Sequence, residues 1–189
     1  MLRPIVLAAA LSLVPSATLA AERSYSVTGF DRIRVEGPYA VTLSVGRAPS
    51  ARASGSPQAL DAVRIEVQGR TLVVRQNRTS GMGTSSGSLG PVTIALSTHD
   101  LTAGWLSGAG TLEIDRLKGL SPSLEVTGSG AIQVGDVSAD KLTVGITGAG
   151  SAKLSGKAKT VTAIVRGASR LDAEALTAKD AIIAVQGPS

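Results

Sequence analysis

Few residue types in this chain of 189 residues could carry out chemistry. It has no cysteine and one histidine, His99. That inventory excludes disulfides, thiol catalysis, cysteine-ligated zinc, iron–sulfur clusters and a lipid-modified N-terminal cysteine. A His-rich metal site is excluded as well. The sequence therefore predicts no metal and no other cofactor.

Two groups of charged residues are candidates for acid–base catalysis: Asp136 and Asp140 with Lys141, and Lys153 with Asp172. Carboxylates held about 5–10 Å apart act as acid and base in enzymes that cleave polysaccharides. However, Asp136 and Asp140 lie in a turn-forming stretch, where aspartate commonly bonds its own backbone. Lys153 and Asp172 are expected to form an exposed ion pair. We predict no catalytic residue, and a small polysaccharide lyase or hydrolase is the alternative.

Three further features suggest sites only weakly. His99 and Asp100 are adjacent, so in a strand they point to opposite faces, which argues against a catalytic triad. Gly81 and Gly83 lack the lysine and the following helix of a phosphate-binding loop. Trp105 either packs the N-terminal strands against the repeats described below or offers a platform for a sugar.

Residues 1–20 have the layout of a secretory signal peptide. Arg3 is followed by an apolar run at 5–14, and Thr18 and Ala20 occupy the −3 and −1 positions of a cleavage site. The run is too short to span a bilayer. We predict export to the periplasm or beyond, with a mature domain at 21–189 that spans no membrane.

Positive charge is concentrated in the first half of the mature chain. Residues 21–99 carry nine arginines, no lysine and five acidic residues, whereas residues 100–189 are neutral overall. An anionic envelope surface could meet this arginine-rich half. A solvated outer face is the favoured interpretation, because the arginines alternate with apolar residues. Nucleic acid is excluded as a partner by export and by the scarcity of aromatic residues.

Short strands dominate residues 21–100. Polar and apolar residues alternate with a period of two, which is typical of half-buried strands. These stretches are 32–35, 41–45, 63–68 and 72–75, with one helical turn at 59–62. Residues 79–90 are rich in Gly and Ser and predict a flexible loop.

Glycine triplets recur at a nearly constant interval through residues 101–189. They begin at Gly108, Gly128, Gly148, Gly167 and Gly187. In the first three triplets the third position is also glycine: Gly110, Gly130 and Gly150. A fixed period of about 20 residues in a strand-rich sequence indicates a solenoid. We interpret the glycines as structural corners, not as ligand-binding residues, because they recur at every repeat.

Aliphatic residues keep fixed offsets from each first glycine. Two positions before it are Leu106, Val126, Ile146, Val165 and Val185. Four positions after it are Leu112, Ile132, Ala152 and Leu171, and six after it are Ile114, Val134, Leu154 and Ala173. Such columns predict a single-stranded parallel β-helix with coils of about 20 residues, all-β and filled by aliphatic side chains.

The pattern resembles an exported bacterial family, the auto-transporter adhesin head domain or GIN domain. The resemblance covers about residues 25–189. It rests on Phe-x-x-Ile-x-Val at 30–35, Gly-x-x-x-Val-x-Leu at 37–43, Gly-x-x-Leu-x-Val at 69–74, and the first Gly-x-Gly coil at 108–110. It implies an exported β-helical domain, right-handed by default, and no established reaction.

The sequence departs from the family pattern in two respects. It stops within a coil, where family members continue, so a C-terminally truncated member is expected; a complete chain would expose strand edges that invite pairing. It also has no translocator barrel. We predict a non-enzymatic, adhesion-like binding module of the envelope, whose partner is a cell-envelope glycan or another envelope protein.

Overall fold

The computed structural model describes residues 21–77 and 90–187, and most of them lie in strands. The elements are β1 (Ala21–Tyr25), β2 (Arg32–Glu36), β3 (Ala40–Val45), β4 (Ser50–Gly55), α1 (Pro57–Asp61), β5 (Val63–Gln68), β6 (Thr71–Gln76), β7 (Thr93–Thr98), β8 (Ala103–Gly108), β9 (Thr111–Gly119), β10 (Ser123–Gly128), β11 (Ala131–Gly148), β12 (Ser151–Gly167) and β13 (Arg170–Gln186). The predicted signal peptide and nearly all of the Gly/Ser-rich segment lie outside the described residues.

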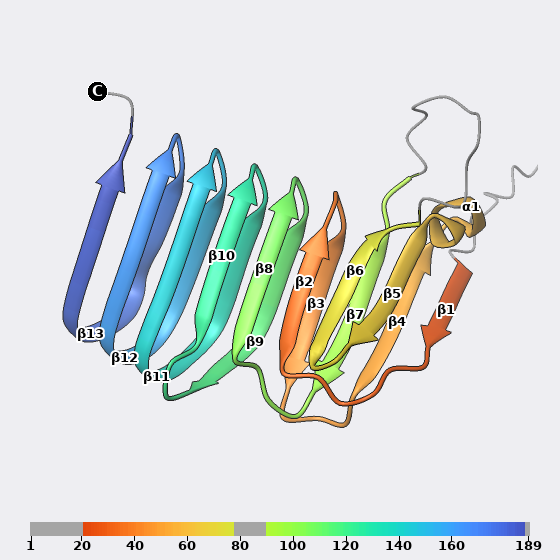
Figure 1. Ribbon diagram of the computed structural model, residues 1–189, viewed down its shortest axis with the longest axis horizontal. Helices are drawn as coiled ribbons and strands as arrows, with labels where there is room; N and C mark the ends of the chain where they lie inside the picture. The colour runs from red at the N-terminus through yellow and green to blue at the C-terminus, as the bar shows by residue number, and fades with distance from the viewer. Residues whose placement is uncertain (1–20, 78–89, 188–189) are drawn as a thin grey trace, which may run out of the picture.

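The strands form the two facing walls of a flattened solenoid (Figure 1). Hydrogen-bonded neighbours follow the order β1-β4-β7-β3-β9-β11-β10-β8-β2-β6-β5, and β12 and β13 extend it beyond β11. This order passes from one wall to the other at β11, because β11 pairs with β9 through its first half and with β10 through its second half. We call the wall with β5, β6, β2, β8 and β10 the front sheet, and the wall with β1, β4, β7, β3 and β9 the back sheet.

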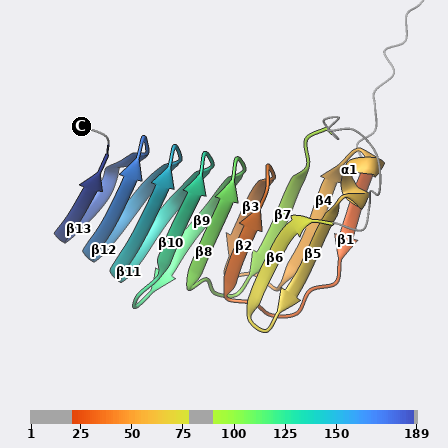
Figure 2. The ribbon, with the colours of Figure 1, turned by 45° about the horizontal axis from the view of Figure 1, so that its top comes forward.

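The repeats stack in parallel and in register. Gly128 lies beside Gly108 on one side and Gly148 on the other, and Gly148 lies beside Gly167. Each coil runs up the front sheet, turns at a glycine corner and descends the back sheet, as Figure 2 also shows. The predicted all-β architecture, a parallel β-helix with coils of about 20 residues, is confirmed.

The core lies between the two walls and consists of the predicted aliphatic columns. Leu106, Val126, Ile146 and Val165 are all at most 5% exposed, and they oppose the buried Leu112, Ile132 and Ala152 column of the back sheet. Val185 differs, because it is 69% exposed. It lies on β13, which pairs only with β12 among the described strands, so no described rung covers it.

Strands β2 and β3 form a rung that is out of sequence order. Strand β2 pairs with β6 and β8, and β3 pairs with β7 and β9. At the corner the Gly37 amide donates to the Ser107 carbonyl at 2.9 Å. Gly37 therefore continues the column formed by Gly108, Gly128 and Gly148.

The N-terminal end of the solenoid closes with antiparallel strands. Strand β4 lies between β1 and β7 and is antiparallel to both, and β5 and β6 form an antiparallel hairpin. Helix α1 begins after Ser56, whose hydroxyl accepts from the Ala59 amide at 3.2 Å. The predicted helical turn is confirmed, beginning two residues earlier than expected.

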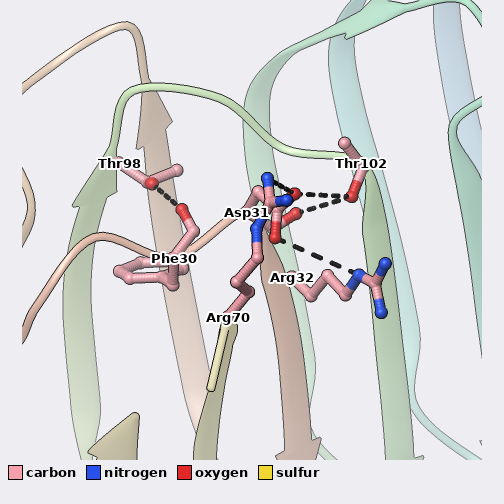
Figure 3. A network of polar contacts seen from close by, with 6 residues as sticks. All are labelled: Phe30, Asp31, Arg32, Arg70, Thr98 and Thr102. Carbon is pink, nitrogen blue, oxygen red and sulfur yellow. Dashed lines mark hydrogen bonds and ion pairs between the residues drawn. The ribbon is translucent and has the colours of Figure 1, made fainter. Parts of the chain in front are cut away.

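A polar network ties the out-of-order rung to its neighbours (Figure 3). The Asp31 carboxylate, only 10% exposed, accepts from Arg70 Nη2 at 2.5 Å, which links β2 to the β5–β6 hairpin. The Asp31 carbonyl accepts from the Thr102 amide at 2.7 Å, which links β2 to β8. The Thr98 hydroxyl donates to the Phe30 carbonyl. These bonds satisfy backbone groups where the chain crosses between rungs.

The buried phenol of Tyr39, beside the Gly37 corner, is expected to destabilise the fold at alkaline pH. Burial raises the pKa of its phenol above the usual 10.0, and Tyr25 raises it further. The fold therefore favours the neutral phenol. Its contribution to stability is complete below the unfolded-state pKa of about 10, and it is lost as pH rises from there through the folded-state pKa.

We expect Tyr39→Phe to shift the midpoint of alkaline unfolding, followed by circular dichroism between pH 8 and 12, to higher pH. Urea unfolding of both proteins at pH 7 is the control, because it isolates the packing effect of losing the hydroxyl. An unchanged alkaline midpoint would contradict a titrating Tyr39.

Candidate functional site

The outer face of the front sheet carries one row of unlike side chains at adjacent strand positions. In register, Arg34 of β2 lies beside Trp105 of β8, which lies beside Glu125 of β10, which lies beside Gly145 of β11. These residues point outward because they alternate with the buried columns of the core. Three separate segments of the chain thus contribute to one row.

Trp105 is the centre of a depression on this face. The depression has a volume of about 260 Å³ and is lined by Arg34, Glu36, Trp105, Leu106, Ser107, Glu125 and Thr127. The Arg34 guanidinium carbon lies 5.5 Å from the centroid of the indole ring, within the range of a cation–π contact. The indole is half-buried, so part of it stays open to solvent. We call this depression the Trp105 groove.

A second depression continues the groove across β6. It has a volume of about 360 Å³, shares Arg34 and Glu36 with the first, and adds Gln68, Thr71, Val73 and Arg75. The two together extend across five neighbouring strands, β5, β6, β2, β8 and β10. A ligand on this face would therefore contact both the N-terminal rungs and the first repeats.

The charges around the groove fall into two classes. Arg75 and Arg64 both contact Glu66 at 2.7 Å, and the hydrogen bond from Arg64 is the largest cause of a lowered Glu66 pKa. Arg34, Glu36 and Glu125, by contrast, have no ion-pair partner among the described residues. The groove thus presents charges that the described fold does not neutralise.

Most other arginines of the first half are engaged in ion pairs. Arg23 contacts Asp61 at 2.7 Å, Arg52 contacts Glu22 at 3.4 Å, and Arg70 contacts Asp31. This arrangement agrees with the interpretation of a solvated outer face. A broad cationic patch is not what these side chains form.

Trp105 lies outside the core. It therefore does not pack within the interior between the N-terminal strands and the repeats. It does contact a residue of an N-terminal strand, Arg34, but across the outer surface. The sequence left its role open, and its place on the face follows from a register with β2 that no local pattern reveals.

The predicted acid–base candidates are held apart in the structure. Asp136 lies beside Arg116 in register, while Asp140 contacts Lys159 at 2.8 Å where the coil bends a second time. The predicted Lys153–Asp172 ion pair is present at 3.9 Å. Each carboxylate therefore has a cationic neighbour of its own.

A depression on the back sheet gathers other charged groups. It measures about 360 Å³, and its charged lining residues are Glu113, Asp115 and Lys153. Asp115 Oδ1 accepts from the amides of Val45, at 2.8 Å, and Arg116, at 2.6 Å, so this carboxylate already bonds the backbone. Within 21–77 and 90–187, no cluster of three or more His, Asp or Glu side chains could hold a metal ion.

The corner glycines adopt two geometries. Gly108, Gly128, Gly148 and Gly167 have φ between +85° and +116°. Gly110, Gly130 and Gly150 instead leave no room, because a Cβ there would lie 2.6 to 2.9 Å from a backbone carbonyl oxygen of the preceding rung. Gly187 shows neither feature, since its nearest contact would be 3.7 Å away. That the first two groups are structural corners stays our proposal.

Residues 29–189 match the family model described as "Putative auto-transporter adhesin, head GIN domain". The chain belongs to this family. The match spans all the described strands of the GIN domain except β1, and it confirms the resemblance expected from the sequence. A comparison with curated proteins found no match.

Solved structures share the fold of this GIN domain. A "putative adhesin" from Parabacteroides distasonis is 18% identical with a TM-score of 0.63, and the alignment covers 89% of this chain and 79% of that one. A "putative lipid binding protein" from the same organism has the same TM-score and coverage at 15% identity. A "putative adhesin" from Bacteroides fragilis is 12% identical with a TM-score of 0.54, and the alignment covers 90% of this chain and 95% of that one.

The family and these neighbours are named as adhesins or binding proteins and not as enzymes. Among residues 21–77 and 90–187 of the GIN domain, no helix has the length and apolar character needed to cross a membrane.

Proposed function

We propose that this GIN domain is an exported, non-enzymatic binding module of the bacterial envelope, and that it holds its ligand in the Trp105 groove. The observation that carries the proposal is a half-exposed indole between Arg34 and Glu125, with charges that no described residue pairs. An aromatic side chain with a few convergent polar groups in a depression is typical of binding sites.

The rigidity of the platform supports this assignment. Arg34, Trp105 and Glu125 all project from paired strands, so their backbones are fixed by hydrogen bonds on both sides. Sites on strands hold their geometry better than sites on loops, and a preformed site loses less entropy on binding. The adhesin names of the family and of the solved relatives agree with a binding role.

Export is the second part of the proposal. The signal-like segment at 1–20, cleaved after Ala20, would deliver the domain to the periplasm or the cell exterior. The adhesin description of the family supports an envelope location. N-terminal sequencing of the protein recovered from the periplasm and the medium tests both the cleavage site and the compartment.

The alternative is a small carbohydrate-active enzyme on the same scaffold. The back-sheet depression favours it, because Glu113 and Lys153 line one hollow there. Release of reducing ends or unsaturated sugars from envelope polysaccharides would support this alternative. Loss of that turnover in Glu113→Gln would assign it to the back sheet.

The binding proposal is tested with cell-envelope preparations. We expect the purified chain to bind them saturably, and Trp105→Ala to weaken binding at least tenfold, because the indole supplies the largest apolar surface of the groove. Gln58→Ala, an exposed substitution on α1 that lines none of the depressions described above, is the matched control. Equal binding by Trp105→Ala and the unaltered chain would contradict the proposed site.

A further inference from the structure

We propose that the ligand of the Trp105 groove is a neutral oligosaccharide. This inference rests on the binding function proposed above and narrows it to one ligand class. It depends on three properties of the groove: a flat apolar surface, a mixture of hydrogen-bond donors and acceptors, and the sign of the net charge.

The indole of Trp105 supplies the flat surface. A sugar ring presents C–H groups on its faces and hydroxyls at its edge, so it suits an aromatic side chain surrounded by polar groups. The neighbouring position in the row beyond Glu125 is Gly145, which has no side chain to obstruct a ring lying along the sheet. Arg34 stands over the indole at 5.5 Å and so orders it before any ligand arrives.

The polar lining matches hydroxyl groups. Arg34 offers guanidinium donors, Glu36 and Glu125 offer carboxylate acceptors, and Ser107 and Thr127 offer hydroxyls that both donate and accept. A sugar hydroxyl also donates and accepts, so it can use both kinds of partner at once. Because no described residue forms an ion pair with Arg34 or the two glutamates, these groups are available to a ligand.

The net charge of the groove selects against an acidic sugar. Arg34 contributes one positive charge, and Glu36 and Glu125 contribute two negative ones. The nearest further cation, Arg75, is already paired with Glu66 at 2.7 Å. A uronate, sialate or phosphate group would therefore meet net like charge, which opposes its binding.

The length of the groove favours several sugar units over one. Polar groups continue from the Trp105 groove into the second depression through Gln68 and Thr71. The five strands from β5 to β10 span four inter-strand spacings, about 19 Å. A chain of sugars lying across the strands would place one unit on Trp105 and the next toward β6.

The test uses the intrinsic fluorescence of Trp105, which is the single tryptophan of the chain. Neutral and acidic oligosaccharides from an array are titrated into the full chain, and binding is confirmed by calorimetry. We expect a neutral oligosaccharide to shift the emission saturably and to bind at least tenfold more tightly than its uronate-containing counterpart.

Two variants test the contacts. Trp105→Phe keeps an aromatic ring and is expected to weaken binding only severalfold, whereas Trp105→Ala loses at least tenfold by calorimetry. Glu125→Gln removes one carboxylate acceptor, so affinity for the neutral ligand should fall while affinity for the acidic one rises. Gln58→Ala should change neither, and circular dichroism verifies that each variant is folded.

The outcomes separate this inference from the function on which it rests. Tighter, Trp105-dependent binding of acidic sugars overturns the neutral assignment and leaves the binding site in place. Binding of envelope preparations through Trp105 without binding of any saccharide overturns the saccharide class alone. If neither the envelope nor a sugar requires Trp105, the proposed site itself is wrong.

Discussion

Gly148→Ala is expected to destabilise the fold by about 2–4 kcal/mol, which combines backbone strain with a collision between rungs. Gly148 has a φ of +116°, where an L side chain is strained, and its added Cβ would lie 2.6 Å from the Gly128 carbonyl oxygen. Relief requires the two rungs to separate. Urea unfolding followed by circular dichroism measures the loss.

Substitutions at two other glycines separate the backbone strain from the collision between rungs. Gly69 has a φ of +62° with nothing within 4 Å of a Cβ, so Gly69→Ala should cost only about 1 kcal/mol of strain. Gly29 has neither a positive φ nor a close neighbour, and Gly29→Ala should be nearly neutral. If Gly148→Ala costs no more than Gly69→Ala, the corner contacts contribute nothing and our assignment of the corner glycines fails.

Ile146→Ala should cost about 2–5 kcal/mol, because it opens a cavity in the column between the two walls. Ile146 is fully buried, and its strand neighbours in register are Val126 and Val165. The interior of a two-walled solenoid is narrow, so few side chains can move to fill the space. The midpoint of urea unfolding should fall with little change in its slope.

Ile183 provides the matched control for this prediction. It is also an isoleucine on the front-sheet half of a coil, but it is 58% exposed because β13 is the last described strand. Ile183→Ala should change stability by less than about 0.5 kcal/mol. Comparable losses in the two variants would show that burial in the column is not what sets the cost.

The repeats could be predicted because the spacing of residues in the sequence gives their register directly. Glycine recurs at a nearly constant interval, and an apolar residue precedes it by two positions, so one alignment of Gly108, Gly128, Gly148 and Gly167 fixes the coils. In such a repeat, residues that are one period apart in the sequence are neighbours in the structure. The departures from the pattern lie on β13, where Val185 is exposed and Leu171 and Ala173 are only partly buried. The pattern does not show which rungs are covered by a neighbour on both sides.

The out-of-order rung could also have been found. Gly37 has Val35 two positions before it and Val41 four after it, the same offsets that Leu106 and Leu112 have from Gly108. The structure pairs these residues directly. The signal was missed because a single coil, separated from the others by intervening strands, does not produce a period.

The candidate site could not be predicted in the same way. Arg34 and Trp105 lie on strands that are adjacent only because the rung of β2 and β3 inserts before β8 and β9. Arg34 occupies a variable position of the motif at 30–35 and Trp105 belongs to no motif, so neither residue indicates the other as its neighbour. Arg34 and Trp105 are neighbours because of the order in which the rungs stack, and patterns in a single sequence do not determine that order.

That stacking order also determines the sequence in which the strands can pair during folding. A chain synthesised from its N-terminus delivers β2 and β3 early, but their partners β8 and β9 follow about seventy residues later, as the Val45–Asp115 hydrogen bond illustrates. Closing so long a loop precedes any gain from the contacts, and high contact order slows folding. The pairing of this rung with the first glycine coil must therefore await the synthesis of that coil. The later coils can then add one after another, each templated by the edge before it.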